Sequence, residues 1–261
     1  MEVGEHGWSG DTLGSCRGDT MKPPARELRK PNVGTIKRSI IDAILRDTIA
    51  FCKTMQFHLP PFAYWTPEDW RDAGHEYDEI RDRQLGWDIT DYGWGEFERA
   101  GLVLFTIRNG DPNARTAYEK SYCEKLLIVG EGQHTPFHYH MGKMEDIICR
   151  GGGNLHVQVC NCAKTGRQLA DTPVMVNTDG RVREVEAGET IVLTPGASIT
   201  LPPRLYHDFW AEGGTSLVGE VSKVNDDEHD NFFLEPVGRF PIIEDDEPPL
   251  HLLCNEYPRA R

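Results

Sequence analysis

The apolar positions follow a helical spacing near the start of the chain and a strand-like pattern from about residue 101. From Thr35 to Cys52, apolar residues recur every three or four positions, which predicts a helix with one buried face. The apolar stripe consists of Ile40, Ile41, Ile44, Leu45, Thr48, Ile49 and Cys52. Thr35 precedes the stripe and is a plausible N-cap, because a threonine hydroxyl can accept a hydrogen bond from a free N–H of the first turn.

A second helix is predicted at residues 65–70, WTPEDW. Thr66 is the expected N-cap, Pro67 takes the first helical position, and acidic side chains suit the first turn. The aromatic segment from Gly86 to Phe97 is interpreted as a loop. Residues 35–100 are therefore expected to be a helical and loop segment that packs on the rest of the domain.

From residue 101 onward the pattern is that of short β-strands. The runs are rich in β-branched and aromatic residues and are separated by Gly, Asn, Asp and Pro. They are GLVLFTIRNG, EKLLIVGEGQ, TPFHYH, EDIICR, LHVQVC, REVEAGETIVL, SITLPP and SLVGEVSKV. A parallel sheet would need helices between the strands, and none is predicted there. We therefore expect a mainly β protein with an antiparallel double-sheet barrel, or jelly roll, and helices from both ends of the chain laid against it.

The composition is that of an ordinary globular chain with an acidic balance. Hydrophobic residues make up 38% and charged residues 27% of the 261 positions, and the formal net charge is −14. Such a surface repels phosphate backbones and anionic membranes, so neither nucleic acid nor a membrane is an expected partner. Residues 1–34 are rich in Gly, Asp, Ser and Pro without periodicity, which predicts a flexible N-terminal extension.

The sequence favours a cytoplasmic location. There is no apolar run near 18 residues, and the first residues lack the basic region and apolar stretch of a signal peptide. The seven cysteines are an odd number without a paired framework, which fits a reducing compartment better than a disulfide scaffold.

The segment between Gly132 and Gly152 carries the most specific chemistry in the chain. With these glycines, His138, His140 and Glu145 follow the spacing G-x5-H-x-H-x4-E-x6-G. Two histidines two positions apart on a strand point to the same face, and Glu145 can return to that face across a short turn. Three ligands would then converge from one hairpin. Mixed imidazole and carboxylate ligation suits a divalent transition metal.

A fourth donor is available in residues 201–209, LPPRLYHDF, where His207 follows a Pro-Pro pair. The combination resembles the cupin family, whose first motif carries two His and a Glu and whose second carries the last His. The second motif is looser here. Gly188, Pro195 and Gly196 match it, but His207 arrives several residues late. On this resemblance, residues 101–261 form the cupin barrel with its tail, in one structural domain from about residue 35, and a homodimer is expected.

Each histidine also has an ordinary interpretation, as a core or surface residue satisfied by hydrogen bonds. His134 is the ambiguous one, because it lies four positions before His138 and could be a substrate-side group or a support for a ligand.

The flanking sequence resembles the D-lyxose ketol-isomerase family of sugar isomerases over roughly residues 36–258. The segments that carry the resemblance are FCKTMQFHLPPFAYWTPEDW, HTPFHYHMGKMEDIICRGGG, LYHDFW, EVSKVNDDEHDNFF and GRFPIIEDDEPPLHLLCNEYP. The resemblance implies an enzyme that interconverts D-lyxose and D-xylulose, and D-mannose and D-fructose, with a divalent metal such as Mn²⁺, or else Co²⁺, Fe²⁺, Ni²⁺ or Zn²⁺. It places the metal ligands on His138, His140, Glu145 and His207.

Aldose–ketose conversion moves a proton from C2 to C1 through a cis-enediol whose negative charge needs stabilising. A general base must reach the C2 proton, and a carboxylate is the usual choice. Glu220, in a predicted strand, and Glu235 and Glu244, in the tail, are the candidates, and the sequence does not choose among them. Each could instead be a solvated surface carboxylate.

Two lysines can donate to sugar or enediolate oxygens. Lys125 is favoured, because it begins the strand before the His-x-His and alternates with apolar residues, although it could also face water. Lys143 stands between the ligands, and Gln133 and Arg239 are weaker candidates of the same kind.

Two other functions are compatible with the same ligands. A cupin dioxygenase would use them to hold ferrous iron, and a non-catalytic cupin would only bind a sugar. The match of the tail to the isomerase family argues against the dioxygenase.

Overall fold

The computed structural model describes residues 35–111, 118–164, 168–227, 229–238 and 241–260. The predicted N-terminal extension, residues 1–34, and the candidate Arg239 lie outside this part of the chain. No helix in the described ranges is both long and apolar enough to span a membrane.

The strands form one hydrogen-bonded network with two branches. Two long strands, β6 (Glu145–Asn161) and β11 (Leu205–Lys223), pair with each other along most of their length. The first branch adds β2 (Gly86–Thr90), β3 (Leu102–Asn109), β4 (Tyr122–Val129), β10 (Ser198–Leu201), β7 (Val174–Thr178) and β8 (Arg181–Val185). The second branch adds β5 (Thr135–His140), β12 (Asn231–Phe233) and β9 (Thr190–Leu193).

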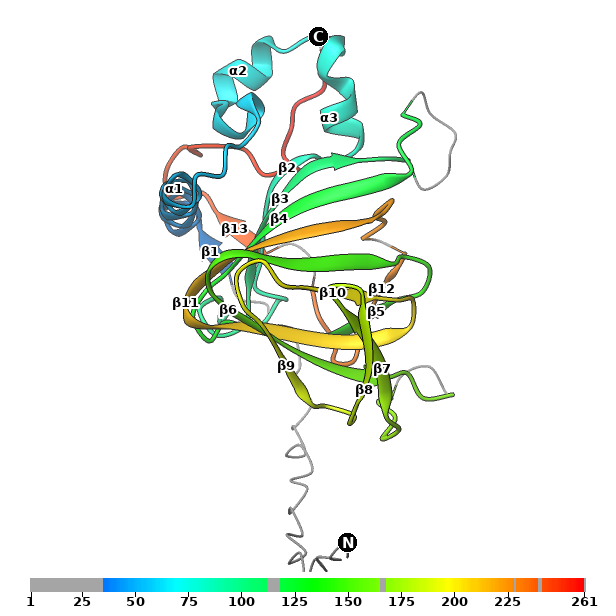
Figure 1. Cartoon of the computed structure of the whole chain (residues 1–261). Helices are drawn as coiled ribbons and strands as arrows, with labels where there is room; N and C mark the ends of the chain where they lie inside the picture. Colours follow the sequence, from blue (N-terminus) through cyan, green and yellow to red (C-terminus); the bar gives the residue numbers. More distant parts are fainter. Residues whose placement is uncertain (1–34, 112–117, 165–167, 228, 239–240, 261) are drawn as a thin grey trace, which may run out of the picture.

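Each long strand takes part in both branches. The first half of β11 pairs with β5 and its second half with β4, while β6 pairs with β10 and then with β9. One buried hydrophobic cluster contains residues of both branches, such as Leu127 and Phe209, so the branches face each other (Figure 1). The predicted mainly β, antiparallel double-sheet fold is confirmed.

Glycines allow the long strands to bend. The backbone of β6 takes a left-handed conformation at Gly152, with φ of +82°, and the pairing register of β11 shifts between Glu212 and Ser216. A Cβ added at Gly152 would lie 2.1 Å from the carbonyl oxygen of Thr215, so the strands approach too closely for a side chain. Because glycines usually interrupt a strand, the sequence predicts EDIICR and LHVQVC as separate strands, whereas both belong to β6.

Gly152→Ala is expected to destabilise the protein much more than Gly180→Ala. Both glycines have a left-handed φ, +82° and +81°, which costs an alanine about 1–2 kcal/mol. At Gly180 nothing lies within 4 Å of an added Cβ, whereas at Gly152 the clash adds about 1–3 kcal/mol. Urea unfolding of both variants measures the difference, and equal losses would contradict the close approach of the strands.

The first helix packs on the outer face of the first branch. α1 (Arg38–Thr54) buries Ile41, Leu45 and Cys52 against residues of β2, β3 and β4. The prediction of Thr35 as N-cap is wrong. Residues 35–37 form β1 (Thr35–Lys37), which pairs with β13 (Ile242–Glu244), and this pairing holds them extended until the helix begins at Arg38.

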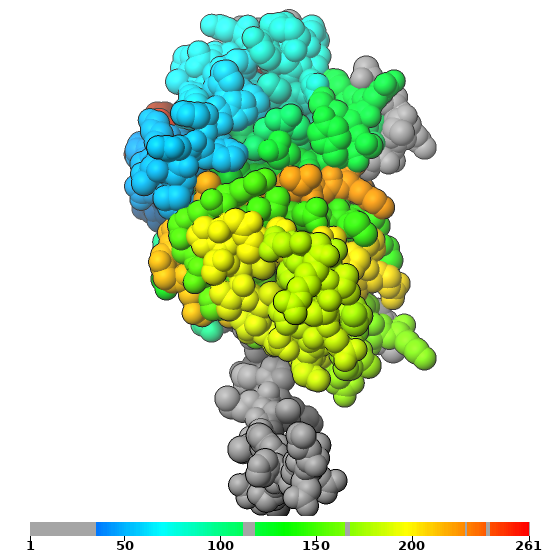
Figure 2. All heavy atoms as spheres, viewed as in Figure 1, coloured from blue at the N-terminus to red at the C-terminus, as the bar shows by residue number. Residues whose placement is uncertain are grey.

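The remaining helices are short and gather beyond β2 (Figure 1). They are η1 (Pro61–Tyr64), α2 (Pro67–Asp72), η2 (His75–Tyr77) and α3 (Asp78–Asp82). The start of α2 is as predicted, with a reciprocal capping box between Thr66 and Asp69 and Pro67 in the first turn. Figure 2 shows that the cyan residues of these helices cover one end of the molecule, away from the yellow residues of β9.

Two further expectations need correction. The predicted loop from Gly86 begins as strand β2, whose residues are all buried because Trp87 and Ile89 face the helices while Asp88 and Thr90 face the sheet interior. No helix forms at the C-terminal end of the described chain, where only the short strands β12 and β13 follow β11. The prolines of this tail break helical structure; they are Pro236, Pro241, Pro248, Pro249 and Pro258.

The tail is held against α1 by buried charge. Arg38 is 3% exposed, and its guanidinium donates to Glu256 at 3.1 Å and to Asp245 at 3.0 Å. Burial alone would lower the pKa of Arg38, but these two carboxylates raise it. The carboxylate of Asp42 also accepts the backbone N–H of Leu250 at 3.0 Å. The tail therefore completes the packing of the first helix.

Candidate metal centre and adjoining cavity

The structure brings the predicted histidines together inside the sheet. His138 and His140 point to one face of β5, and His207 is directly opposite His138 on the neighbouring β11. All three are buried, and each offers one ring nitrogen within 4.8 Å of the others. The alternation of strand side chains and one cross-strand pairing are enough to produce this cluster.

Hydrogen bonds fix which nitrogen of each ring carries the proton. The Nδ1 atom of His138 lies 2.9 Å from the carbonyl oxygen of Pro136, and that of His207 lies 3.1 Å from the carbonyl oxygen of Leu205. The Nδ1 atom of His140 has the same kind of contact, described below. Because a carbonyl oxygen only accepts, each Nδ1 is the donor, and each Nε2 of a neutral ring presents a lone pair.

The cluster fits a cation. Within the described residues, the buried Nε2 of His207 has no hydrogen-bond partner. Burial, followed by the neighbouring rings of His207 and His140, lowers the pKa of His138 well below its ordinary value, so this ring is neutral. Converging lone pairs without donors are unfavourable in a protein interior unless a cation lies between them. A divalent metal supplies that charge, and neutral imidazole is a usual ligand for it.

Glu145 adds a carboxylate to the cluster. Its Oε1 atom lies 3.2 Å from Nε2 of His207, and its Oε2 atom lies 3.4 Å from Nε2 of His140. Burial alone would raise the pKa of Glu145, but the charge of Lys143 and the contacts to His140 hold it well below its usual range. The carboxylate is therefore ionised and able to bind a cation.

The predicted hairpin of ligands is wrong in its pairing. β5 and β6 make no ladder with each other in the described residues, because each pairs with β11 instead. Glu145 begins β6 opposite Ser222, near the end of β11, whereas His207 lies near its start. Glu145 therefore faces the histidines across the interior, from the other branch.

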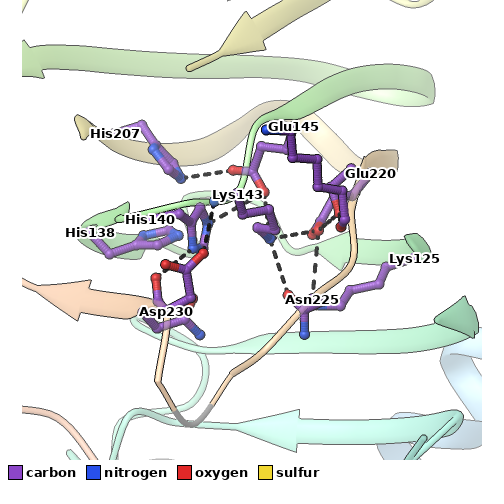
Figure 3. A network of polar contacts seen from close by, with 12 residues as sticks. Lys125, His138, His140, Lys143, Glu145, His207, Glu220, Asn225 and Asp230 are labelled. Atoms are coloured by element: carbon purple, nitrogen blue, oxygen red, sulfur yellow. Dashed lines mark hydrogen bonds and ion pairs between the residues drawn. The ribbon is translucent and has the colours of Figure 1, made fainter. Parts of the chain in front are cut away.

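A buried lysine connects Glu145 to a second carboxylate. The Nζ atom of Lys143 lies 2.7 Å from Oε2 of Glu145 and 2.8 Å from Oε1 of Glu220, and it donates to Oδ1 of Asn225 at 3.2 Å (Figure 3). Burial alone would lower the pKa of Lys143, but the two carboxylates raise it well above its usual value. An ammonium group therefore sits between the two glutamates.

Lys125 approaches Glu220 from the neighbouring strand. Its Nζ atom lies 3.5 Å from Oδ1 of Asp227 and 4.0 Å from Oε1 of Glu220. Burial alone would lower the pKa of Lys125, but the charges of Asp227 and Glu220 raise it. The hydroxyl of Ser222 shares its one proton between Oε1 of Glu220, at 3.1 Å, and the carbonyl oxygen of Lys223, at 2.8 Å.

These groups line a cavity of about 240 Å³ between the two branches. One end is polar, with His138, His140, Glu145, Lys143, Lys125, Glu220, Asp227 and Asn231. The walls beyond are apolar, with Leu102, Leu104, Leu127, Ile147, Phe209, Phe233 and Val237. Such a cavity is suited to a small polar molecule held at one end by several directed groups.

The predicted base candidates are separated by the fold. Glu220 is 5% exposed and lines the cavity. Glu235 follows β12, is partly buried and is not among the residues that line the cavity. Glu244 is exposed on β13, where it lies opposite Lys37 in the ladder with β1, outside the cavity.

His134 and Gln133 also lie outside the cavity lining. Nδ1 of His134 contacts the buried Asp208 at 3.1 Å, and its ring stacks on Trp210. The amide of Gln133 donates to the carbonyl oxygen of Phe97 and accepts from the backbone N–H of Gly130, which orders the turn before β5.

The sequence did not single out Asp230, which supports the cluster from the loop after β11. Its carbonyl oxygen lies 3.2 Å from Nδ1 of His140, and its carboxylate accepts the backbone N–H groups of Gly142 and Lys143, each at 2.8 Å. The run DDEHDN that contains it reads as a solvated turn. A ligating histidine usually needs a partner for its other nitrogen, but spacing alone does not identify that partner.

Comparisons with known proteins match most of the chain. A family model described as D-lyxose isomerase matches residues 36–257. The D-lyxose/D-mannose isomerase of Escherichia coli O157:H7 is 48% identical over 229 residues, covering 87% of this chain and 100% of that protein. The D-lyxose/D-mannose isomerase of Serratia proteamaculans is 48% identical over 227 residues, covering 86% and 99%.

Solved structures with a similar fold are more distant in sequence. The L-ribose isomerase of Acinetobacter sp. DL28 in complex with L-ribose superposes with a TM-score of 0.52 at 16% identity, covering 82% of this chain and 100% of that chain. The ligand-free L-ribose isomerase of Cellulomonas parahominis gives 0.51 at 16% identity, covering 80% and 99%. At this identity the likeness shows a common fold and nothing about the substrate.

Proposed function

The chain belongs to the D-lyxose isomerase family and is therefore a sugar isomerase, and we propose that it interconverts D-lyxose with D-xylulose and D-mannose with D-fructose in a metal-dependent reaction. The curated relatives named above are D-lyxose/D-mannose isomerases, which supports the choice of sugars. The observation that carries the proposal is the cavity itself. It places a cluster suited to a cation beside a separate buried carboxylate, Glu220.

We assign the metal to His138, His140, Glu145 and His207. Four protein ligands leave open positions in an octahedral ion, and nitrogen with oxygen donors suits Mn²⁺, our first choice. When bound, such an ion would polarise the sugar carbonyl and stabilise negative charge on neighbouring oxygens. Asp230 holds His140 through its carbonyl oxygen, and Lys143 holds the carboxylate of Glu145.

Glu220 is the proposed base. Its carboxylate takes the proton from C2 of the aldose and returns it to C1 on the same face, while the hydroxyl proton of O2 passes to O1, and a cis-enediol lies between the two steps. Lys143 and Ser222 fix Oε1 of Glu220, so its orientation is set before the sugar binds. The ammonium groups of Lys143 and Lys125 donate to sugar oxygens and favour the negative charge that develops there.

Product analysis tests the proposal against the other two cupin functions. Manganese-loaded protein is incubated with D-lyxose, D-mannose, L-ribose and D-xylose, with and without oxygen, and the ketoses are separated. We expect D-xylulose to form from D-lyxose and D-fructose to form from D-mannose, each at the same rate with and without oxygen. A strict need for oxygen would support a dioxygenase, and binding without turnover would support a sugar-binding protein. The homodimer and the cytoplasmic location stay predictions from the sequence.

Asp230→Ala is expected to weaken metal binding by about tenfold, because groups that orient ligands typically contribute on that scale. The substitution removes the carboxylate that fixes the turn carrying Lys143 and leaves the loop that orients His140 less well held. Titration calorimetry with Mn²⁺ measures the change. Asp226→Ala is the matched control, because that carboxylate contacts the exposed His229 in the same loop, and equal effects would contradict the role of Asp230.

A further inference from the structure

The cavity has a second polar end, which the proposed proton transfer does not use. Asp88 and Thr90 on β2 line it, and they are 6% and 9% exposed. Their side chains face inward because the alternate residues Trp87 and Ile89 pack on the other face of the strand, toward α1. The hydroxyl of Thr90 accepts the backbone N–H of Tyr92 in the turn after β2, and the carboxylate of Asp88 offers acceptor oxygens suited to a sugar hydroxyl.

Strand registers place Asp88 relative to the proposed base. Glu220 is opposite Lys125, Lys125 is opposite Thr106, and Thr106 is opposite Gly86, so one row crosses the sheet from β11 to β2. Asp88 lies two residues beyond Gly86 along β2. For strands about 4.8 Å apart with a rise of about 3.3 Å per residue, a flat sheet would separate the two Cα atoms by roughly 16 Å.

This separation suits a molecule held at both ends. The side chains of Glu220 and Asp88 each reach several ångströms into the cavity, and a hydrogen bond adds about 2.8 Å. An extended sugar chain, with C–C bonds of about 1.5 Å, can bridge what remains. Leu104, opposite Asp88 on β3, and Leu127, opposite Leu104 on β4, lie between the two polar ends and offer an apolar wall to the carbons of the chain.

We propose that Asp88 accepts a hydrogen bond from the terminal hydroxyl of a six-carbon substrate and thereby sets the preference for hexose over pentose. The inference rests on the proposed function, because it needs the reacting end of the sugar to lie at the metal cluster and Glu220. D-Mannose has the configuration of D-lyxose at C2, C3 and C4 and carries one more carbon with its hydroxyl. That added hydroxyl extends the chain toward β2, so the buried carboxylate discriminates by chain length.

Asp88→Ala should therefore affect the two chain lengths differently. We expect the dissociation constant of D-mannitol, the polyol of D-mannose, to rise about tenfold, since a hydrogen bond to a charged group contributes on that scale. The dissociation constant of D-arabinitol, the polyol of D-lyxose, should stay within about twofold. The ratio of kcat/KM for D-mannose to that for D-lyxose should fall by the same factor as mannitol binding.

Two further variants serve as a conservative substitution and as a control outside the cavity. Asp88→Asn preserves the side-chain volume and should shift mannitol binding in the same direction by a smaller factor, which covers the case in which the alanine variant does not fold. Asp42→Asn changes a buried carboxylate outside the cavity and should leave both polyol constants unchanged. Equal shifts for the two polyols in the Asp88 variants, or no shift in either, would overturn the inference. Absence of turnover by the unaltered protein would count against the proposed function instead, since the polyol comparison needs no reaction.

Discussion

Replacing His207 by alanine is expected to remove both bound metal and sugar turnover. The Nε2 atom of His207 is buried and presents a lone pair toward Glu145 at 3.2 Å, so the side chain has little role there except as a ligand. Loss of a group that only orients a ligand costs 10–100-fold, and loss of the ligand itself should exceed about a hundredfold. Metal content after gel filtration and the rate of ketose formation measure the two losses. His138→Ala and His140→Ala should behave alike.

His156→Ala is the matched control for these ligand variants. His156 lies on β6, opposite Trp210 of β11, and contacts that ring rather than the cavity. Its loss should leave metal content and turnover within about twofold. Full metal content in all three ligand variants would contradict the assigned site.

Glu220→Gln is expected to lower turnover by about a hundredfold or more while metal content stays unchanged. The amide cannot accept the C2 proton, and general base catalysis typically contributes on that scale. Glutamine keeps the volume of the side chain, and among the described residues Lys143 connects Glu220 to Glu145 of the metal cluster. Substrate labelled with deuterium at C2 should react more slowly in the unaltered enzyme, and part of the label should reach C1 of the ketose.

Glu244→Gln and Glu235→Gln are the controls, because neither side chain lines the cavity. Both should retain the rate of the unaltered protein. A near-normal rate for Glu220→Gln would assign proton transfer to another group. Complete transfer of deuterium to C1 without exchange, together with unaffected carboxylate variants, would replace the enediol by a hydride shift.

Local patterns in the sequence were sufficient for part of this architecture. The run TPFHYH predicts strand β5 with its bounds, and two histidines two positions apart must then share a face. The capping box of α2 is equally local, since Thr66 and Asp69 are three positions apart. These features depend on residues that are neighbours in the chain, so their periodicity is enough to predict them.

The features that could not be predicted depend on distant partners. From the sequence alone Thr35 is expected to cap the helix. In the structure β13, some two hundred residues later, holds it in a strand instead. The segment after Gly86 reads as an aromatic loop, because burial on both faces of β2 comes from α1 on one side and the cavity on the other. The choice of Glu220 over Glu244 likewise required knowing which strand lies beside the cavity.

The ion pair between Arg38 and Glu256 bears on the order in which the chain can fold during synthesis. The two residues are 218 positions apart, so the helix that begins at Arg38 leaves the ribosome long before its charge partner. Strands β4 and β11, which both contribute to the surface that α1 packs on, are also far apart from each other in the chain. Arg38 therefore lacks its buried ion-pair partner until the tail emerges, although β2, β3 and β4, which form most of the surface that α1 packs on, are made earlier. Translation pauses late in the message should prolong that state, whereas early pauses should not.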